Sequence, residues 1–130
     1  MSRGTRASRW EQALRQALDA VDHALEDRFG GLLPLHASRP PRRATANPKY
    51  DGLFAVDSKF SLGLVSRSGP GYVIDVRLAS TASPTASQRE AILNAAEEAL
   101  QEELPKVFPG RALQVTRVRN TGLRITGDLS

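Results

Sequence analysis

The chain has 130 residues, of which 40% are hydrophobic and 25% charged, which suits one soluble domain with a single core rather than two domains. It has no cysteine, which excludes disulfides, thiolate metal sites and cysteine nucleophiles, and no run approaches the roughly 18 apolar residues of a membrane span. The net charge of +4 is uneven, since residues 1–50 hold nine Arg and Lys against five Asp and Glu, whereas residues 51–130 hold nine against nine, so the whole cationic surplus is N-terminal.

An amphipathic helix is predicted near the N-terminus, over residues 9–28. Ser8 and Glu11 have the spacing of a capping box, and the Gly30-Gly31 pair is expected to end the helix in the left-handed conformation. Apolar residues recur at intervals of three and four, as in a helix with one buried face: Trp10, Leu14, Ala17, Leu18, Val21, Leu25 and Phe29.

A segment rich in arginine and proline, residues 34–50, follows this helix, and we call it the strap. Its Pro40, Pro41 and Pro48 lack backbone donors and fix φ, which predicts an extended or polyproline-like loop rather than a central strand. The strap is longer than the usual connection of about 4 to 6 residues, and long loops are commonly either functional or disordered. The sequence alone leaves both alternatives open.

Two segments with a period of two follow the strap and predict an antiparallel hairpin. Its turn is expected at Arg67–Gly71. The outward face carries Asp57 and Lys59 on the first strand and Asp75 and Arg77 on the second. The inward face is apolar on both strands: Phe54, Val56, Phe60, Leu62 and Leu64, then Tyr72, Ile74, Val76 and Leu78.

A second amphipathic helix is predicted to begin at the helix-start signals in Ser83–Gln88 and to end near Pro105. Its apolar stripe contains Ile92, Leu93, Ala96, Leu100 and Leu104. A third strand around Leu113–Val118 and a shorter fourth around Leu123–Ile125 are predicted next, joined through a turn at Asn120–Gly122.

The element order α-β-β-α-β-β predicts an α+β fold. We expect a two-layer sandwich, in which a mainly antiparallel four-stranded sheet has both helices packed on one face and meets water with the other. The chain then divides into a basic N-terminal arm, residues 1–8, and a single domain, residues 9–130, with the strap as an extended loop. The pattern does not fix the order of the strands in the sheet.

Metal binding has one weak candidate, the helix face that carries Asp19, His23 and Asp27. Their spacing of four residues places them on one side of the helix, where oxygen and nitrogen ligands could hold a metal. Solvated charges on a helix face commonly have the same spacing, and this is the better explanation. We therefore expect no metal site.

Catalytic signals are equally weak. The phosphate-binding patterns GxxxxGK[ST] and GxGxxG are both absent. Asp57 and Asp75 share the outer sheet face and could form an acid–base pair, but ion pairing with Lys59 and Arg77 explains them better. We expect no catalytic residue and no cofactor, and an enzyme of unknown class stays as the second alternative.

The surplus of cations favours a binding function. We expect a small non-enzymatic domain whose basic arm and strap contact an acidic partner, either another protein or a second copy of the chain. The alternative is sequence-independent binding to a nucleic-acid backbone, although the aromatic side chains that would stack on bases have inward parity. A cytoplasmic location and no membrane partner are expected. The candidate contact residues are Arg3, Arg6, Arg9, Arg39, Arg42, Arg43, Lys49 and Tyr50.

Overall fold

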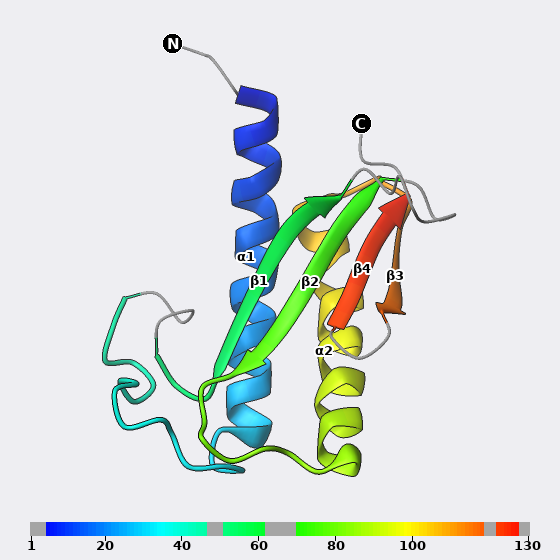
Figure 1. The fold of residues 1–130 in the computed structure, drawn as a ribbon. Coiled ribbons are helices and arrows are strands. Elements are labelled where there is room, and N and C mark those ends of the chain that lie inside the picture. The colour runs from blue at the N-terminus through cyan, green and yellow to red at the C-terminus, as the bar shows by residue number, and fades with distance from the viewer. Residues whose placement is uncertain (1–4, 47–50, 62–69, 119–121, 128–130) are drawn as a thin grey trace.

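The computed structural model describes residues 5–46, 51–61, 70–118 and 122–127 of the chain. Two helices and four strands lie in the predicted order, which confirms the α+β fold (Figure 1). Their bounds are α1 Thr5–Phe29, β1 Phe54–Ser61, β2 Gly71–Leu78, α2 Ala86–Val107, β3 Leu113–Val118 and β4 Gly122–Gly127.

The four strands form one antiparallel sheet with the order β1-β2-β4-β3. Both helices cover the same face of this sheet, as Figure 1 shows. In the first hairpin Val56 lies opposite Val76 and Phe60 lies opposite Tyr72, so the predicted parity of the two strands is confirmed. The predicted residues Leu62 and Leu64 and the turn at 67–69 lie outside the described residues.

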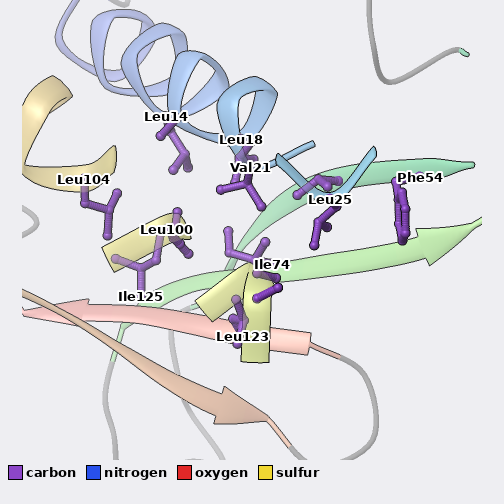
Figure 2. Packing of buried hydrophobic residues seen from close by; sticks show 14 of the residues in the cluster. Leu14, Leu18, Val21, Leu25, Phe54, Ile74, Leu100, Leu104, Leu123 and Ile125 are labelled. Carbon is purple, nitrogen blue, oxygen red and sulfur yellow. The ribbon is translucent and has the colours of Figure 1, made fainter. Parts of the chain in front are cut away.

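The hydrophobic core lies between the helices and the sheet. Side chains of α1 point toward the sheet and toward α2, and they meet Ile74, Leu123 and Ile125 from the two central strands (Figure 2). The predicted apolar stripe of α1 is thus the buried one, with Leu14, Ala17, Leu18, Val21 and Leu25 at most 1% exposed. Burying a valine or leucine side chain contributes roughly 1.5 to 3 kcal/mol.

The ends of α1 differ from the prediction. The helix begins at Thr5, four residues early, so Ser8 lies inside it and is not the N-cap. Nothing in the preceding Thr-Arg-Ala stretch breaks a helix, because alanine and arginine are good helix formers. The predicted left-handed stop is also wrong, since neither Gly30 nor Gly31 has a positive φ. The N–H of Gly30 instead donates to the carbonyl of Glu26 at 2.8 Å.

The start of α2 follows the prediction. Thr85 caps the helix and forms a capping box with Gln88, in which each side chain accepts from the other residue's backbone N–H. The helix continues two residues past Pro105 to Val107, although the missing N–H of this proline removes one intrahelical hydrogen bond. Neither described helix combines the length and apolarity needed to cross a membrane.

Candidate functional site

The two cationic regions predicted from the sequence lie apart along α1. The basic arm leads into the first turns of α1, whereas the strap lies beside the last turns (Figure 1). The strap contacts α1 at Asp22. Arg9 lies 13 residues before Asp22, which is about 20 Å along a helix axis. Arg9 and the described part of the strap therefore lie at different ends of α1.

The strap is held to the body of the protein by a carboxylate cluster, which we define as Asp22, Glu26 and Asp51 around the guanidinium of Arg42. Nη1 of Arg42 lies 2.9 Å from Oδ1 of Asp51, and Nη2 lies 3.0 Å from Oε1 of Glu26 and in contact with Asp22. The side chain of Arg42 is 15% exposed, and those of Asp22 and Asp51 are 0% and 1% exposed. The guanidinium of Arg42 is thus directed into the fold.

Arg39 is also engaged inside the molecule. Its Nε donates to the carbonyl of Gly52 at 2.9 Å, and its Nη2 donates to the carbonyls of Asp51 and Phe54 at 3.0 Å. The backbone adds to this anchoring, since the N–H of Gly52 donates to the carbonyl of Pro40 at 2.9 Å. Over its described residues, the strap is an ordered segment fastened to β1 and α1.

Burial and the local charges shift the pKa values in the carboxylate cluster. Burial raises the pKa of Asp22 from 3.8 to about 6, against the hydrogen bond and charge of Arg42, and nearby Glu26 adds to the rise. Burial acts to raise the pKa of Asp51 as well, but donors from Thr45 and the charge of Arg42 outweigh it, so that pKa is lowered. Three carboxylates share one guanidinium, and the pKa values of the two most buried ones, Asp22 and Asp51, are shifted in opposite directions.

The structure describes only some of the remaining predicted contact residues. Arg9 and Arg43 are exposed, at opposite ends of α1. Arg6 lies within α1, but its side chain is outside the described part. Arg3, Lys49 and Tyr50 lie outside the described residues.

An aromatic row, which we define as Phe60, Tyr72, Trp10 and Phe108, lies where α1 begins. The ring of Trp10 stacks on Phe108 with centroids 3.9 Å apart and on Tyr72 at 5.7 Å, and Phe60 meets Tyr72 edge-on at 5.3 Å. Phe60 is 48% exposed, and in the described part of the chain it is the one large apolar side chain open to solvent. The row therefore runs from the core to the surface.

A groove opens beside Trp10, between the first turns of α1 and the end of α2. We call it the N-terminal groove; its volume is about 400 Å³. Its lining includes Arg9, Trp10, Ala13, Phe108, Pro109 and Arg111. The guanidinium carbon of Arg111 lies 5.7 Å from the centre of the Trp10 ring, within range of a cation–π interaction.

Asp19, one of the three residues considered for metal binding, is engaged with a neighbouring arginine. Asp19 accepts a hydrogen bond from Nε of Arg15 at 2.9 Å, and within the described ranges no three His, Asp or Glu side chains are grouped to hold a metal ion. A pocket of about 220 Å³ brings His23 near Asp51. Oδ1 of Asp51 accepts from Arg42 and Oδ2 accepts from Thr45, so that carboxylate is committed to the strap.

Asp57 on the outer sheet face is paired with Arg77, as predicted, and also with Arg15, which the sequence analysis did not predict. Its Oδ2 lies 3.6 Å from Nη2 of Arg77 on the neighbouring strand. Its Oδ1 lies 3.7 Å from Nη1 of Arg15, which reaches around the edge strand from α1. Nη2 of Arg15 also donates to the carbonyl of Val56 at 2.8 Å, so this side chain covers part of the β1 edge.

Sequence reasoning missed both the carboxylate cluster and the aromatic row. One signal for the cluster was available, because Asp22 follows Leu18 by four residues and so lies within the apolar stripe of α1. A carboxylate on a buried face needs a cationic partner. The row had no comparable signal, since Trp10 lies in α1 and Phe108 directly follows α2, and the sequence pattern does not fix how the two helices pack.

Comparisons with known proteins place the chain in a family. A curated relative from Borreliella burgdorferi, described as "Uncharacterized protein", is 34% identical over 95 residues, which cover 73% of this chain and 74% of that protein. No solved structure matches the chain. A family described as "Uncharacterised protein" matches residues 5–127, and the chain belongs to that family.

Proposed function

We propose that this protein is a non-enzymatic binding domain that contacts an acidic partner protein through the end of the molecule where α1 begins. The observation that carries the proposal is the exposed ring of Phe60 at the end of the aromatic row. Aromatic residues and arginine are enriched in protein interfaces, and exposed Arg9 lies next to Trp10 in this row. The cytoplasmic location expected from the sequence stays part of the proposal.

The charge expected to attract the partner comes from Arg9 and from the basic arm that precedes it. Exposed Arg43 can add a second cationic contact at the other end of α1. The proposal does not rely on Arg39 and Arg42, because their guanidinium groups bind carbonyls and carboxylates of the fold.

Protein is favoured over nucleic acid as the partner because of how Trp10 is packed. Sequence-independent binding to single strands uses aromatic rings whose faces are open to successive bases. Phe108 and Tyr72 both stack on Trp10, so its ring is already used inside the protein. Among the large apolar side chains in the described part of the chain, Phe60 alone is exposed, and one such ring suits an apolar anchor in a protein interface better than a stacking platform.

The experiment that tests this function is a binding panel with the full chain. Fluorescent acidic peptides of random sequence, single-stranded DNA and duplex DNA are titrated at low salt against the wild type, Phe60→Ser and Phe29→Ser. We expect the peptides to bind and Phe60→Ser to weaken binding about tenfold, because burying a phenyl group contributes roughly 1.5 to 3 kcal/mol. Phe29, near the far end of α1, is the matched control and should change the affinity less than about twofold.

The other outcomes of the panel each decide the question. Binding to DNA alone, with an affinity that falls steeply with salt, would replace the proposal with the nucleic-acid alternative. A mass above the 14.1 kDa monomer in sedimentation, reduced by Phe60→Ser, would identify the partner as a second copy of the chain. Absence of all binding and of self-association would remove the proposed function.

A further inference from the structure

We propose that the free edge of β3 binds the β3 edge of a second copy of the chain, so that the two sheets join into one with four strands from each copy. The strands β3 and β1 are the two outer strands of the sheet, so this contact lies on the edge opposite the one that carries Phe60 (Figure 1). It is therefore separate from the surface in the proposed function and goes beyond that function.

The two outer strands differ in how their edges are covered. On β1, the carbonyl of Val56 accepts from Nη2 of Arg15 at 2.8 Å, and the carbonyl of Phe54 accepts from Nη2 of Arg39 at 3.0 Å. On β3, the backbone hydrogen bonds within the described part of the chain go to β4 alone. An uncovered strand edge presents N–H and C=O groups that can pair with another chain. The edge of β3 is thus the place where a further strand can be added.

The sequence of β3, LQVTRV, lacks the residues that commonly protect an open edge. It contains no proline and no lysine, and its valine and threonine side chains favour strands. Its one charged side chain, Arg117, is held toward α2, with Nε 3.2 Å from Oε1 of Glu97 and Nη2 3.1 Å from Oε2 of Glu90. Gln114 and Thr116, on the outer face, are exposed and uncharged. Charge therefore does not oppose the approach of a second strand.

A second copy fits this edge because β3 can pair with itself in antiparallel register. With a two-fold axis at Val115, that residue lies opposite itself, and Gln114 lies opposite Thr116 of the second copy. Arg117 then lies opposite Leu113, so no two like charges face each other. Every side chain also stays on its own face of the joined sheet, with Val115 on the helix side and Gln114 on the outer side. Such a contact closes with two copies.

A hollow beside the β3 edge provides room for side chains of the second copy. Its volume is about 360 Å³, and its lining includes Gln101, Leu104 and Pro105 of α2 with Leu113 and Val115 of β3. Leu113 and Val115 are half-buried, so each keeps apolar surface that a neighbour can cover. In the two-fold register, the Val115 side chain of the second copy lies next to this hollow. Strand addition of this kind gains affinity from backbone hydrogen bonds and specificity from such alternate side chains.

Sedimentation of the full chain as a function of protein concentration tests the contact. We expect the mass to rise from the 14.1 kDa monomer to twice that value and to level off there. Gln114→Glu combined with Thr116→Glu places carboxylates opposite carboxylates across the axis. This variant should dimerise about tenfold more weakly than the wild type, or less still, because like charges directly opposite each other destabilise a strand pair.

The matched control is Gln114→Lys combined with Thr116→Glu. It differs from the first variant only at residue 114 and places opposite charges across the axis, so its dimerisation should be within about threefold of the wild type or tighter. Within one copy Thr116 lies opposite Arg124, so a glutamate at this position faces no like charge there. Thermal unfolding of both variants verifies that they remain folded.

The outcomes separate this inference from the proposed function. A monomer at every concentration overturns the inference, and so does a mass that rises beyond the dimer, because a two-fold contact closes with two copies. Equal dimerisation of the two variants overturns the β3 contact. If Phe60→Ser then removes the dimer, self-association uses the aromatic row and the proposed function stands alone. If the two variants differ as expected, but no acidic peptide binds and Phe60→Ser has no effect, the proposed function fails and this inference stands.

Discussion

Replacing Arg42 by alanine is expected to lower the free energy of unfolding by about 3 to 5 kcal/mol, because removing one partner of a buried ion pair leaves an uncompensated buried charge. Asp22 and Asp51 are at most 1% exposed and both contact the Arg42 guanidinium, so neither can regain water without moving the strap. The carboxylate cluster would then hold three acids and no cation. Urea unfolding of the variant and the wild type measures the loss.

The neighbouring arginine provides the control. Arg43 is exposed, and Arg43→Ala should change stability by less than about 0.5 kcal/mol, as for most surface substitutions. In the Arg42→Ala background, Asp22→Asn should recover part of the lost stability because it removes one of the buried charges. Equal effects of Arg42→Ala and Arg43→Ala would show that the carboxylate cluster does not hold the strap in solution.

The free energy of unfolding of the wild type, taken relative to that of Asp22→Asn, is expected to fall by up to about 3 kcal/mol between pH 4 and pH 7. The folded-state pKa of Asp22 is raised from 3.8 to about 6, so in this interval the folded protein binds more protons than the unfolded chain. The contribution of Asp22 is therefore complete below its unfolded pKa and is lost as the pH rises through the folded pKa. Urea unfolding of both proteins at half-unit steps of pH measures the difference.

The contribution of Asp51 to stability changes with pH in the opposite direction and over a different pH range. Its pKa is lowered, so its contribution is present above its unfolded value of 3.8 and is lost only as the pH falls through the lowered pKa. Both the wild type and Asp22→Asn contain Asp51, so its contribution cancels when the two free energies of unfolding are subtracted. Parallel stability curves for the two proteins from pH 4 to pH 7 would contradict the burial of an ionisable Asp22.

The elements of the fold could be predicted where the pattern is local. The alternation in β1 and β2 predicted which side chains share a face, although Phe60, which it placed inward, is 48% exposed. The Thr85–Gln88 pair marked the start of α2. The start of α1 was misplaced because a capping-box spacing at Ser8 has no effect when the preceding residues continue the helix. The strand order β1-β2-β4-β3 could not be predicted, since it depends on how the two hairpins meet.

The candidate site was less predictable because its contacts join distant parts of the chain. The sequence indicated that the strap is cationic, but not where its guanidinium groups point. Arg42 contacts Asp22 and Glu26, which are 20 and 16 residues away on α1. The groove depends in the same way on packing, because residues of α1 and residues that follow α2 line it together.

Hydrogen exchange of the full chain, with and without the best-bound acidic peptide, tests the central claim most directly. We predict slower exchange at residues 9–13, 58–60 and 107–111, around the aromatic row and the N-terminal groove, and unchanged exchange at strap residues 36–46. Slower exchange at the strap with none where α1 begins would contradict the account, because the partner would then be bound at the other end of the molecule.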